Sequence, residues 1–198
     1  MLKVAVTGGI GSGKSAVGEI LEELGAVIVD ADELARTVVE RGNSGYDQVI
    51  ATFGDEVLTS GEIDRAKLAG LVFSDPELRK KLEGIIHPLV REAAEEIMKS
   101  APSGSVVVNE IPLLFETNGA KRFDFVIAVQ TPMELRIERL SQRGMKLYEI
   151  EKRIAVQASD QERASIANVI VVNDGSLDQL RSKVEELWFT QLQPKAGS

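Results

Sequence analysis

The chain has 198 residues, of which 43% are hydrophobic and 27% are charged, and this suits one folded domain with room for an inserted subdomain. The 23 Lys and Arg residues are outnumbered by 31 Asp and Glu residues, and the resulting net charge of −8 argues against nucleic acid as a partner. The absence of cysteine excludes disulfides, thiolate catalysis and thiolate metal sites.

The N-terminal residues predict a βαβ unit. Residues 2–6 form a short β-branched strand, residues 15–24 have apolar side chains at helical spacing, and residues 26–29 form a second strand. A glycine-rich stretch separates the first strand from the helix. The first apolar run is too brief for a signal peptide, and no run of about 18 apolar residues occurs, so we expect a cytoplasmic protein without a membrane partner.

The strand signal nearly vanishes from residue 31 to residue 100. Helical patterns occupy most of this stretch, separated by turn clusters such as RGNSG and TSGE. The predicted helices are 34–41, 46–53, 65–73 and 76–99. We interpret residues 31–100 as a helical insertion.

Strand patterns return in the second half of the chain. The predicted strands there are 105–109, 125–130 and 169–172, the predicted helices are 132–143, 147–159 and 177–192, and residues 193–198 are expected to be a frayed tail. Five apolar strands separated by helices predict an α/β fold with a five-stranded, mostly parallel sheet covered by helices on both faces. Residues 1–30 and 101–198 would form this core.

The glycine-rich stretch GGIGSGKS, residues 8–15, fits the phosphate-loop pattern G-x-x-x-x-G-K-[ST] between a strand and a helix. Glycines allow successive N–H groups to converge on phosphate oxygens, Lys14 supplies charge to the β- and γ-phosphates, and the Ser15 hydroxyl can ligate magnesium. The pattern predicts binding of ATP with Mg²⁺. The predicted nucleotide-binding residues here are Gly9, Gly11, Ser12, Gly13, Lys14, Ser15 and Ala16.

A phosphate loop alone leaves the reaction open. A GTPase needs a D-x-x-G string after a strand and an N-K-x-D loop that reads the base, and neither string occurs. The stretch VVVNE resembles the magnesium strand of an ATPase, but Asn109 stands where the magnesium-coordinating aspartate is expected, which weakens that interpretation. A small-molecule kinase remains, in which the helical insertion binds the acceptor.

Asp30 and Asp32 follow the second strand, at the edge where ligands of parallel sheets bind. A carboxylate there can accept a hydroxyl proton, or it can cap the helix that begins near residue 33. We favour the catalytic interpretation for Asp32 and leave both open for Asp30. Arg36 lies one helical turn further and shares the face of Asp32.

Three arginines, Arg136, Arg139 and Arg143, lie on one face of a predicted helix. They form either a solvated charged face or part of a lid, at about residues 140–160, that closes over phosphates. We favour the lid for Arg139 and Arg143. His87 is the only histidine, and by itself it is more readily explained by capping or packing than by catalysis.

Taken together, these segments resemble the dephospho-coenzyme A kinase family. The matching strings are TGGIGSGKS, DADELAR, IIHPLVR, IPLLFE, RIERLSQR, RIAVQ and VVNDGS, which occur in the family's order over residues 6–176. The resemblance implies a P-loop kinase core, a CoA-binding helical domain and a lid. It also implies ATP-dependent phosphorylation of the ribose 3′-hydroxyl of dephospho-CoA, the last step of CoA synthesis.

The resemblance also implies roles for individual residues. Asp32 matches the base, with Lys14 and Arg139 as further catalytic residues. The implied acceptor-binding residues, besides Asp32, are Arg36, His87, Arg91, Pro112, Leu113 and Glu116; Arg139 and Arg143 match the lid; Asn173 and Gly175 match a loop beside adenine.

The chain departs from the family's pattern at two places. Residues 166–168 read IAN where an Ala-Asp pair is usual, and Glu110 stands where many members have aspartate, which leaves its part in the magnesium shell open. The alternatives are a kinase for another nucleotide or nucleoside, and an ATPase or switch with no phosphorylated acceptor. We expect a monomer or a weak homo-oligomer.

Overall fold

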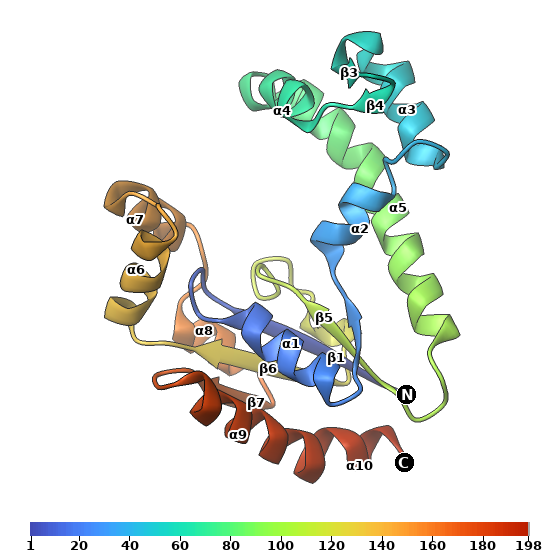
Figure 1. Cartoon of the computed structure of the whole chain (residues 1–198). Helices are drawn as coiled ribbons and strands as arrows, with labels where there is room; N and C mark the ends of the chain where they lie inside the picture. Colours follow the sequence, from blue (N-terminus) through green and yellow to red (C-terminus); the bar gives the residue numbers. More distant parts are fainter. Residues whose placement is uncertain (198) are drawn as a thin grey trace. The chain divides into compact units, whose positions relative to one another are not determined.

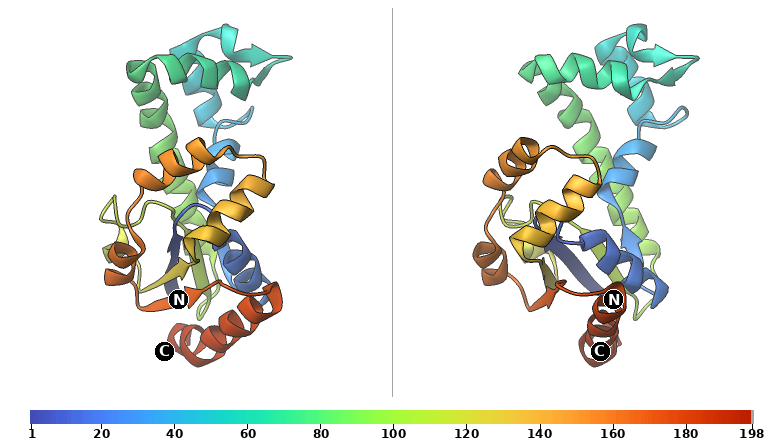
Figure 2. Two further views of the ribbon diagram at one scale, coloured as in Figure 1. Left: turned by 90° about the vertical axis from the view of Figure 1, so that its left-hand side faces the viewer. Right: turned by 60° about the vertical axis from the view of Figure 1, so that its left-hand side comes forward.

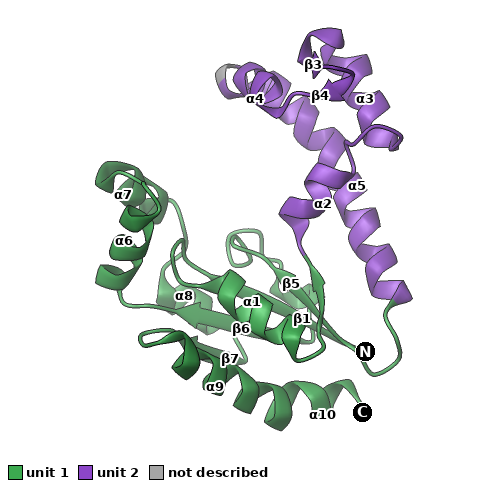
Figure 3. Ribbon diagram, in the orientation of Figure 1, with its two compact units in different colours: residues 1–29, 101–198 green, residues 30–100 purple. Residues whose placement is uncertain are grey.

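The computed structural model describes residues 1–197, which form two compact units (Figures 1 and 3). Unit 1 contains Met1–Val29 and the chain from Ala101 onward, and unit 2 contains Asp30–Ser100. The phosphate loop belongs to unit 1.

Unit 1 contains a five-stranded sheet with the order β2-β5-β1-β6-β7, in which every pairing is parallel. The strands are β1 (Leu2–Gly8), β2 (Val27–Val29), β5 (Val106–Glu110), β6 (Phe125–Gln130) and β7 (Val169–Val172). β1 is the central strand, and its residues from Val4 to Gly8 are all buried, as expected for a strand that is covered on both faces. The predicted parallel five-stranded sheet is confirmed.

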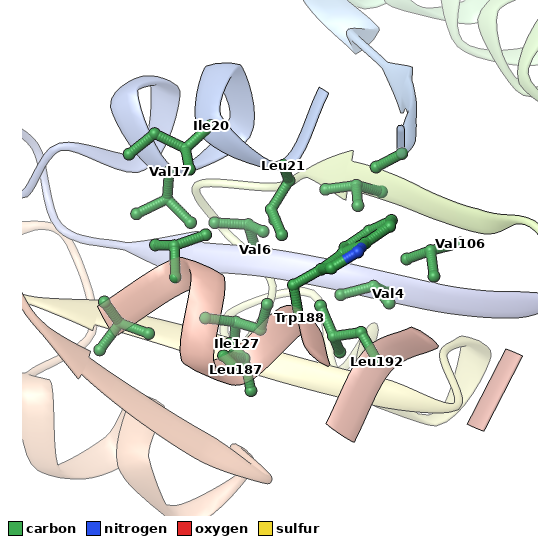
Figure 4. Packing of buried hydrophobic residues seen from close by; sticks show 14 of the residues in the cluster. Val4, Val6, Val17, Ile20, Leu21, Val106, Ile127, Leu187, Trp188 and Leu192 are labelled. Atoms are coloured by element: carbon green, nitrogen blue, oxygen red, sulfur yellow. The ribbon is translucent and has the colours of Figure 1, made fainter. Parts of the chain in front are cut away.

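One face of the sheet carries the main hydrophobic core. It is covered by α1 (Lys14–Glu23) and α9 (Leu177–Leu187), which continues into a π-helical turn, η3 (Trp188–Leu192). Figure 4 shows Trp188 pointing into this cluster beside Leu21 and Val106. The helix α1 is thereby fixed against β1, and its N-terminus is fixed at the end of the phosphate loop.

The opposite face is covered by a smaller cluster. Ala5 and Val126 of the sheet pack with Leu114, which comes from the segment between β5 and β6. That segment contains the short 3₁₀ helix η2 (Ala120–Arg122), and α8 (Asp160–Ser165) packs against β1 and β6. Helices therefore cover both faces, as the α/β fold class requires.

Two helices, α6 (Met133–Gln142) and α7 (Leu147–Ala155), follow β6 and pack against each other (Figure 2). Helix α7 ends four residues before the end that the sequence predicts. The difference arises because Ser159 is the N-cap of a separate helix, α8, and forms a capping box with Glu162.

Unit 2 is mainly helical. Its helices are α2 (Ala31–Thr37), α3 (Ser44–Phe53), η1 (Asp55–Val57), α4 (Arg65–Ser74) and α5 (Pro76–Ser100). Its core contains Val39, Val49, Phe53, Val57 and Leu68. None of the helices described within residues 1–197 is long and apolar enough to cross a membrane.

Unit 2 also contains a hairpin that the sequence prediction missed. Strands β3 (Leu58–Thr59) and β4 (Glu62–Ile63) pair antiparallel around Ser60 and Gly61, which both have positive φ. Two positive φ values at the centre of a two-residue loop are typical of a type I′ hairpin turn. With two residues each, these strands are too short to produce an alternating pattern.

The expected frayed tail is wrong for the described residues 193–197. Gln193–Ala196 form helix α10, and both Leu192 and Ala196 are buried in the main core. The π-helical turn contributes, because it keeps Trp188 and Leu192 on the core side. Ser198 lies outside the described residues.

Candidate active site

The phosphate loop connects β1 to the N-terminus of α1. Gly11 and Gly13 have φ values of 77° and 91°, a region that glycine adopts without strain, and Gly13 is the N-cap of α1. The first N–H groups of α1 therefore point out of the helix end beside the loop, where they can bind an anion.

Two of the loop glycines also leave room for protein side chains. A Cβ on Gly9 would overlap the guanidinium of Arg136, and a Cβ on Gly13 would overlap the amide of Asn173. The Asn173 amide donates to the Ser12 carbonyl at 2.9 Å. The loop is thus held from outside by side chains as well as by its own backbone.

Asn173 is buried, and its side chain contacts the phosphate loop, a role that the predicted adenine contact did not include. Its side chain bonds the phosphate loop, and its carbonyl accepts from Thr131 Oγ1 at 3.0 Å. Gly175 follows in the same loop, where a Cβ would overlap the Gln179 side chain that caps α9. An adenine contact by Asn173 or Gly175 stays a prediction.

Lys14 lies over the loop that precedes it. Its ammonium donates to the Gly8 carbonyl at 3.0 Å and lies 3.5 Å from the Gly9 carbonyl. These bonds hold a positive charge at the loop, beside the N–H groups that would bind phosphate. Ala16 follows in the first turn of α1 and is partly buried.

Ser15 and Glu110 bring two oxygen groups together. The Ser15 hydroxyl donates to Glu110 Oε2 at 3.2 Å. A Cβ on the buried Gly18, one turn along α1, would overlap Glu110 Oε1. Glycine at this position therefore lets the carboxylate lie against the first turns of the helix. A hydroxyl and a carboxylate are hard oxygen ligands, so the pair fits Mg²⁺.

The strand pleat explains why Glu110, and not Asn109, has this position. Successive side chains of a strand point to opposite faces, and Val106 and Val108 belong to the core that α1 covers. Glu110 shares their face, so Asn109 lies on the other one. On sequence alone, Asn109 was compared with the magnesium-coordinating aspartate of an ATPase and the part of Glu110 was left open, and in the structure it is Glu110 that bonds Ser15.

The three arginines of α6 have different surroundings. Arg136 is buried and donates from Nε to the Ile10 carbonyl at 2.9 Å. Burial lowers the pKa of the Arg136 guanidinium, and the Asp160 carboxylate at 3.9 Å partly opposes this shift. Arg139 is half-buried and donates to Asn173 Oδ1 at 3.3 Å, while Arg143 is exposed at the end of α6. Arg139 thus lies beside the phosphate loop. The spacing of the arginines predicted that Arg136 shares their helix face, but it did not predict its contact with the loop.

The two aspartates after β2 differ in their contacts. Asp30 caps α2, because its Oδ1 accepts from the N–H groups of Asp32 and Glu33 at 2.8 and 3.0 Å. Within residues 1–197, no hydrogen bond to the Asp32 carboxylate is found, and this side chain is exposed together with Arg36 on α2. The structure therefore assigns the cap to Asp30.

The other acceptor-region residues of unit 2 are on α5, which packs against α2. His87 and Arg91 are both exposed and lie one turn apart on α5. Arg36 contributes to a cavity of about 390 Å³ within unit 2. Its lining includes the side chains of Arg41 and Arg65 as well as two glutamates.

The segment after β5 contains the remaining predicted residues. Pro112 and Leu113 are exposed, whereas Leu114 is buried and anchors the segment under the sheet. The carboxylate of Glu116 accepts from the Ala158 N–H at 2.7 Å. Glu116 therefore bonds the segment that links α7 to α8, a contact with no signal in the sequence pattern.

The family model and the curated relatives that match this chain belong to one family. The sequence model of the dephospho-CoA kinase family matches residues 2–179. A dephospho-CoA kinase of Thermobifida fusca is 44% identical over 190 residues, which cover 95% of each chain. Among solved structures, TT1252 from Thermus thermophilus has a TM-score of 0.78 at 34% identity and covers 96% of this chain and 97% of its own. The dephospho-CoA kinase from Campylobacter jejuni has a TM-score of 0.73 at 27% identity over 98% of each chain.

Proposed function

The chain belongs to the dephospho-CoA kinase family, and we propose that it transfers the γ-phosphoryl group of ATP to the ribose 3′-hydroxyl of dephospho-CoA. The observation that carries this proposal is the family match over residues 2–179, which includes the phosphate loop and the whole of unit 2. The same family match argues against both alternatives, a kinase for another acceptor and an ATPase without an acceptor.

The phosphate loop would bind the β- and γ-phosphates of ATP. Its N–H groups and the N-terminus of α1 provide fixed partial positive charges, and the Lys14 ammonium adds a full charge. Arg139, beside the loop, and Arg143, at the end of α6, would stabilise the charge that spreads over the transferring group. The loop N–H groups, the α1 N-terminus and Lys14 would be in place before ATP binds, whereas the exposed Arg143 would reach the phosphates when the lid closes.

Ser15 and Glu110 would hold the Mg²⁺ that accompanies ATP. A magnesium ion held there would neutralise part of the negative charge of the ATP phosphates. Glu110 also orients the Ser15 hydroxyl through their hydrogen bond. Because Gly18 has no side chain, the Glu110 carboxylate can lie against this turn of α1.

Unit 2 would bind dephospho-CoA. Asp32 has an exposed carboxylate that is not used for capping, so it can accept the proton of the attacking hydroxyl. Arg36, His87 and Arg91 would bind the acceptor, and the arginines suit its anionic diphosphate. Pro112, Leu113 and Glu116 would contribute from the segment after β5.

The proposed function is tested by product analysis. Purified protein is incubated with Mg²⁺ and ATP plus dephospho-CoA, a panel of nucleotides and nucleosides, or no acceptor. We expect CoA as the phosphorylated product in the first reaction. Another phosphorylated acceptor, or ATP hydrolysis alone, would contradict the proposal. The cytoplasmic location and the monomeric or weakly associating state stay predictions.

A first variant tests the magnesium pair. Glu110→Gln should reduce the gain in ATP affinity that Mg²⁺ provides by about 10- to 100-fold, as for other residues that orient a metal ligand. Gly18→Ala should have the same effect, because the added methyl group displaces the carboxylate. ATP affinity is measured with and without Mg²⁺ by titration calorimetry.

Gly84→Ala is the matched control for Gly18→Ala. Gly84 is exposed on α5, and nothing lies within 4 Å of an added Cβ. Alanine in a helix is favoured over glycine by about 1 kcal/mol, so both variants gain helix propensity and only Gly18→Ala should lose the magnesium effect. Equal magnesium dependence in wild type and Glu110→Gln would remove Glu110 from the metal shell.

A second prediction concerns the lid. If α6 and α7 close over the phosphates, amide hydrogen exchange between Gly144 and Val156 should be fast in the free protein and slower with both substrates bound. Gly144 has a φ of 86° with open space around it, which suits a bending point. Exchange that is unchanged by substrates would leave Arg143 as an ordinary surface arginine.

A further inference from the structure

The peptide of Ile10, inside the phosphate loop, is held on both sides by the region that follows β6. Its N–H donates to Gln157 Oε1 at 2.9 Å, and its carbonyl accepts from Arg136 Nε at 2.9 Å. A backbone N–H can only donate, so the Gln157 amide oxygen must face it. Both partners lie more than a hundred residues further along the chain.

The residue next to Gln157 is held by a different element. The Ala158 N–H donates to the Glu116 carboxylate at 2.7 Å. Glu116 is the last residue of the acceptor segment, residues 112–116, which the resemblance places near the acceptor. Leu114, fully buried, anchors that segment to the sheet. Two consecutive residues therefore connect the phosphate loop to the acceptor segment.

A glycine-rich loop has little stiffness of its own, so the direction of its N–H groups has to be set by outside partners. Donors that are already oriented stabilise transferring charge without reorganisation during the reaction. Gln157 supplies such a partner at Ile10. Glu116, through Ala158, restricts where Gln157 can lie.

We propose that Gln157 is a positioning residue that orients the Ile10 peptide of the phosphate loop, and that Glu116 acts on the loop through Gln157. The proposal rests on the proposed function, because it takes the loop as the ATP site and the segment of Glu116 as the acceptor site. Two hydrogen bonds, at Ala158 and at Gln157, would then connect the acceptor segment to the loop that binds the phosphates.

The test uses Gln157→Ala, Glu116→Ala and the double variant, all in the full chain. Binding of ATP with Mg²⁺, without acceptor, should weaken about 3- to 10-fold in each single variant, the range expected for one lost hydrogen bond. The double variant should be no weaker than Gln157→Ala, because both changes remove one connection. Hydrogen exchange in a peptide spanning residues 8–15 should become faster in parallel.

Two variants on the neighbouring helices α6 and α7 serve as controls. Gln142→Ala removes an exposed side chain that bonds Glu138 on its own helix, and Glu151→Ala removes an exposed carboxylate of α7. Both should match wild type in ATP affinity and loop exchange. Gln157→Glu keeps an acceptor oxygen for the Ile10 N–H, so it should retain the slow loop exchange even if Gln157→Ala folds poorly.

If the fold-losses of ATP affinity in the two single variants multiplied in the double variant, the two hydrogen bonds would act independently and the proposal would be overturned. Wild-type loop exchange in Gln157→Ala, or fast exchange in Gln157→Glu, would overturn it as well. These measurements need no acceptor. A failure of the wild type to phosphorylate dephospho-CoA would contradict the proposed function, whereas these measurements would still decide whether Gln157 orients the Ile10 peptide.

Discussion

Lys14→Ala should lower the turnover of phosphoryl transfer by at least about 10²-fold, the effect of removing one preorganised donor from a site of developing charge. The ammonium is already held at the loop by the Gly8 carbonyl at 3.0 Å, so its charge is present before substrates bind. The loss should appear in kcat, because the charge on the transferring group is greatest in the transition state.

The fold should tolerate the same change. The bonds of the Lys14 ammonium to loop carbonyls are each worth about 1 kcal/mol in stability, so the melting temperature should drop only slightly. Lys99→Ala is the control, because Lys99 forms an exposed ion pair with Glu96 on its own helix, far from the loop in sequence. A well-folded Lys14→Ala protein with turnover near that of wild type would refute the phosphate-loop assignment.

Much of unit 1 could be predicted because its signals are local. Buried parallel strands appear as continuous apolar runs, and β6 and β7 have the bounds that were predicted. The phosphate loop was predictable because its backbone conformation depends on glycine at Gly11 and Gly13, and because a lysine and a serine follow.

The contacts that hold the loop could not be predicted in this way. Gln157, Arg136 and Asn173 reach the loop from distant parts of the chain, and although they lie in strings that match the family, nothing in those strings indicates that their side chains bond the backbone of the loop. Glu110 was ambiguous for a related reason. A strand pattern gives alternation but no absolute direction, so a shift of one residue exchanges the roles of Asn109 and Glu110.

In unit 2, the two aspartates after β2 predicted a helix cap and a candidate base, but which aspartate caps the helix could be decided only from the structure. Either Asp30 or Asp32 could have capped the helix, and only the hydrogen bonds to Asp30 decide between them. The bounds of α3, α4 and α5 were predicted to within two residues, but α2 begins and ends three to four residues before the predicted 34–41, because Asp30 caps it. The hairpin at Ser60 and Gly61 has strands too short for a periodic signal.

Asp32→Asn should lower transfer to dephospho-CoA by about 10²–10⁴-fold, the usual contribution of a general base. A ribose hydroxyl is a poor nucleophile at neutral pH, and a carboxylate within hydrogen-bond reach can orient it and accept its proton as the bond to phosphorus forms. Asparagine has nearly the same shape but lacks the charge and the basic oxygen. Transfer is measured as CoA formed from ATP with Mg²⁺.

Asp30→Asn is the control that the structure provides. Asp30 caps α2 with its side-chain oxygen, and asparagine is an equally good N-cap, so this variant should fold and transfer phosphate within a few-fold of wild type. Asp32→Asn should also fold normally and bind ATP with nearly unchanged affinity. If its transfer persisted within a few-fold of wild type, Asp32 would not be the base. If its ATP affinity collapsed instead, Asp32 would belong to the magnesium shell with Ser15 and Glu110, and the acceptor hydroxyl would need another proton acceptor.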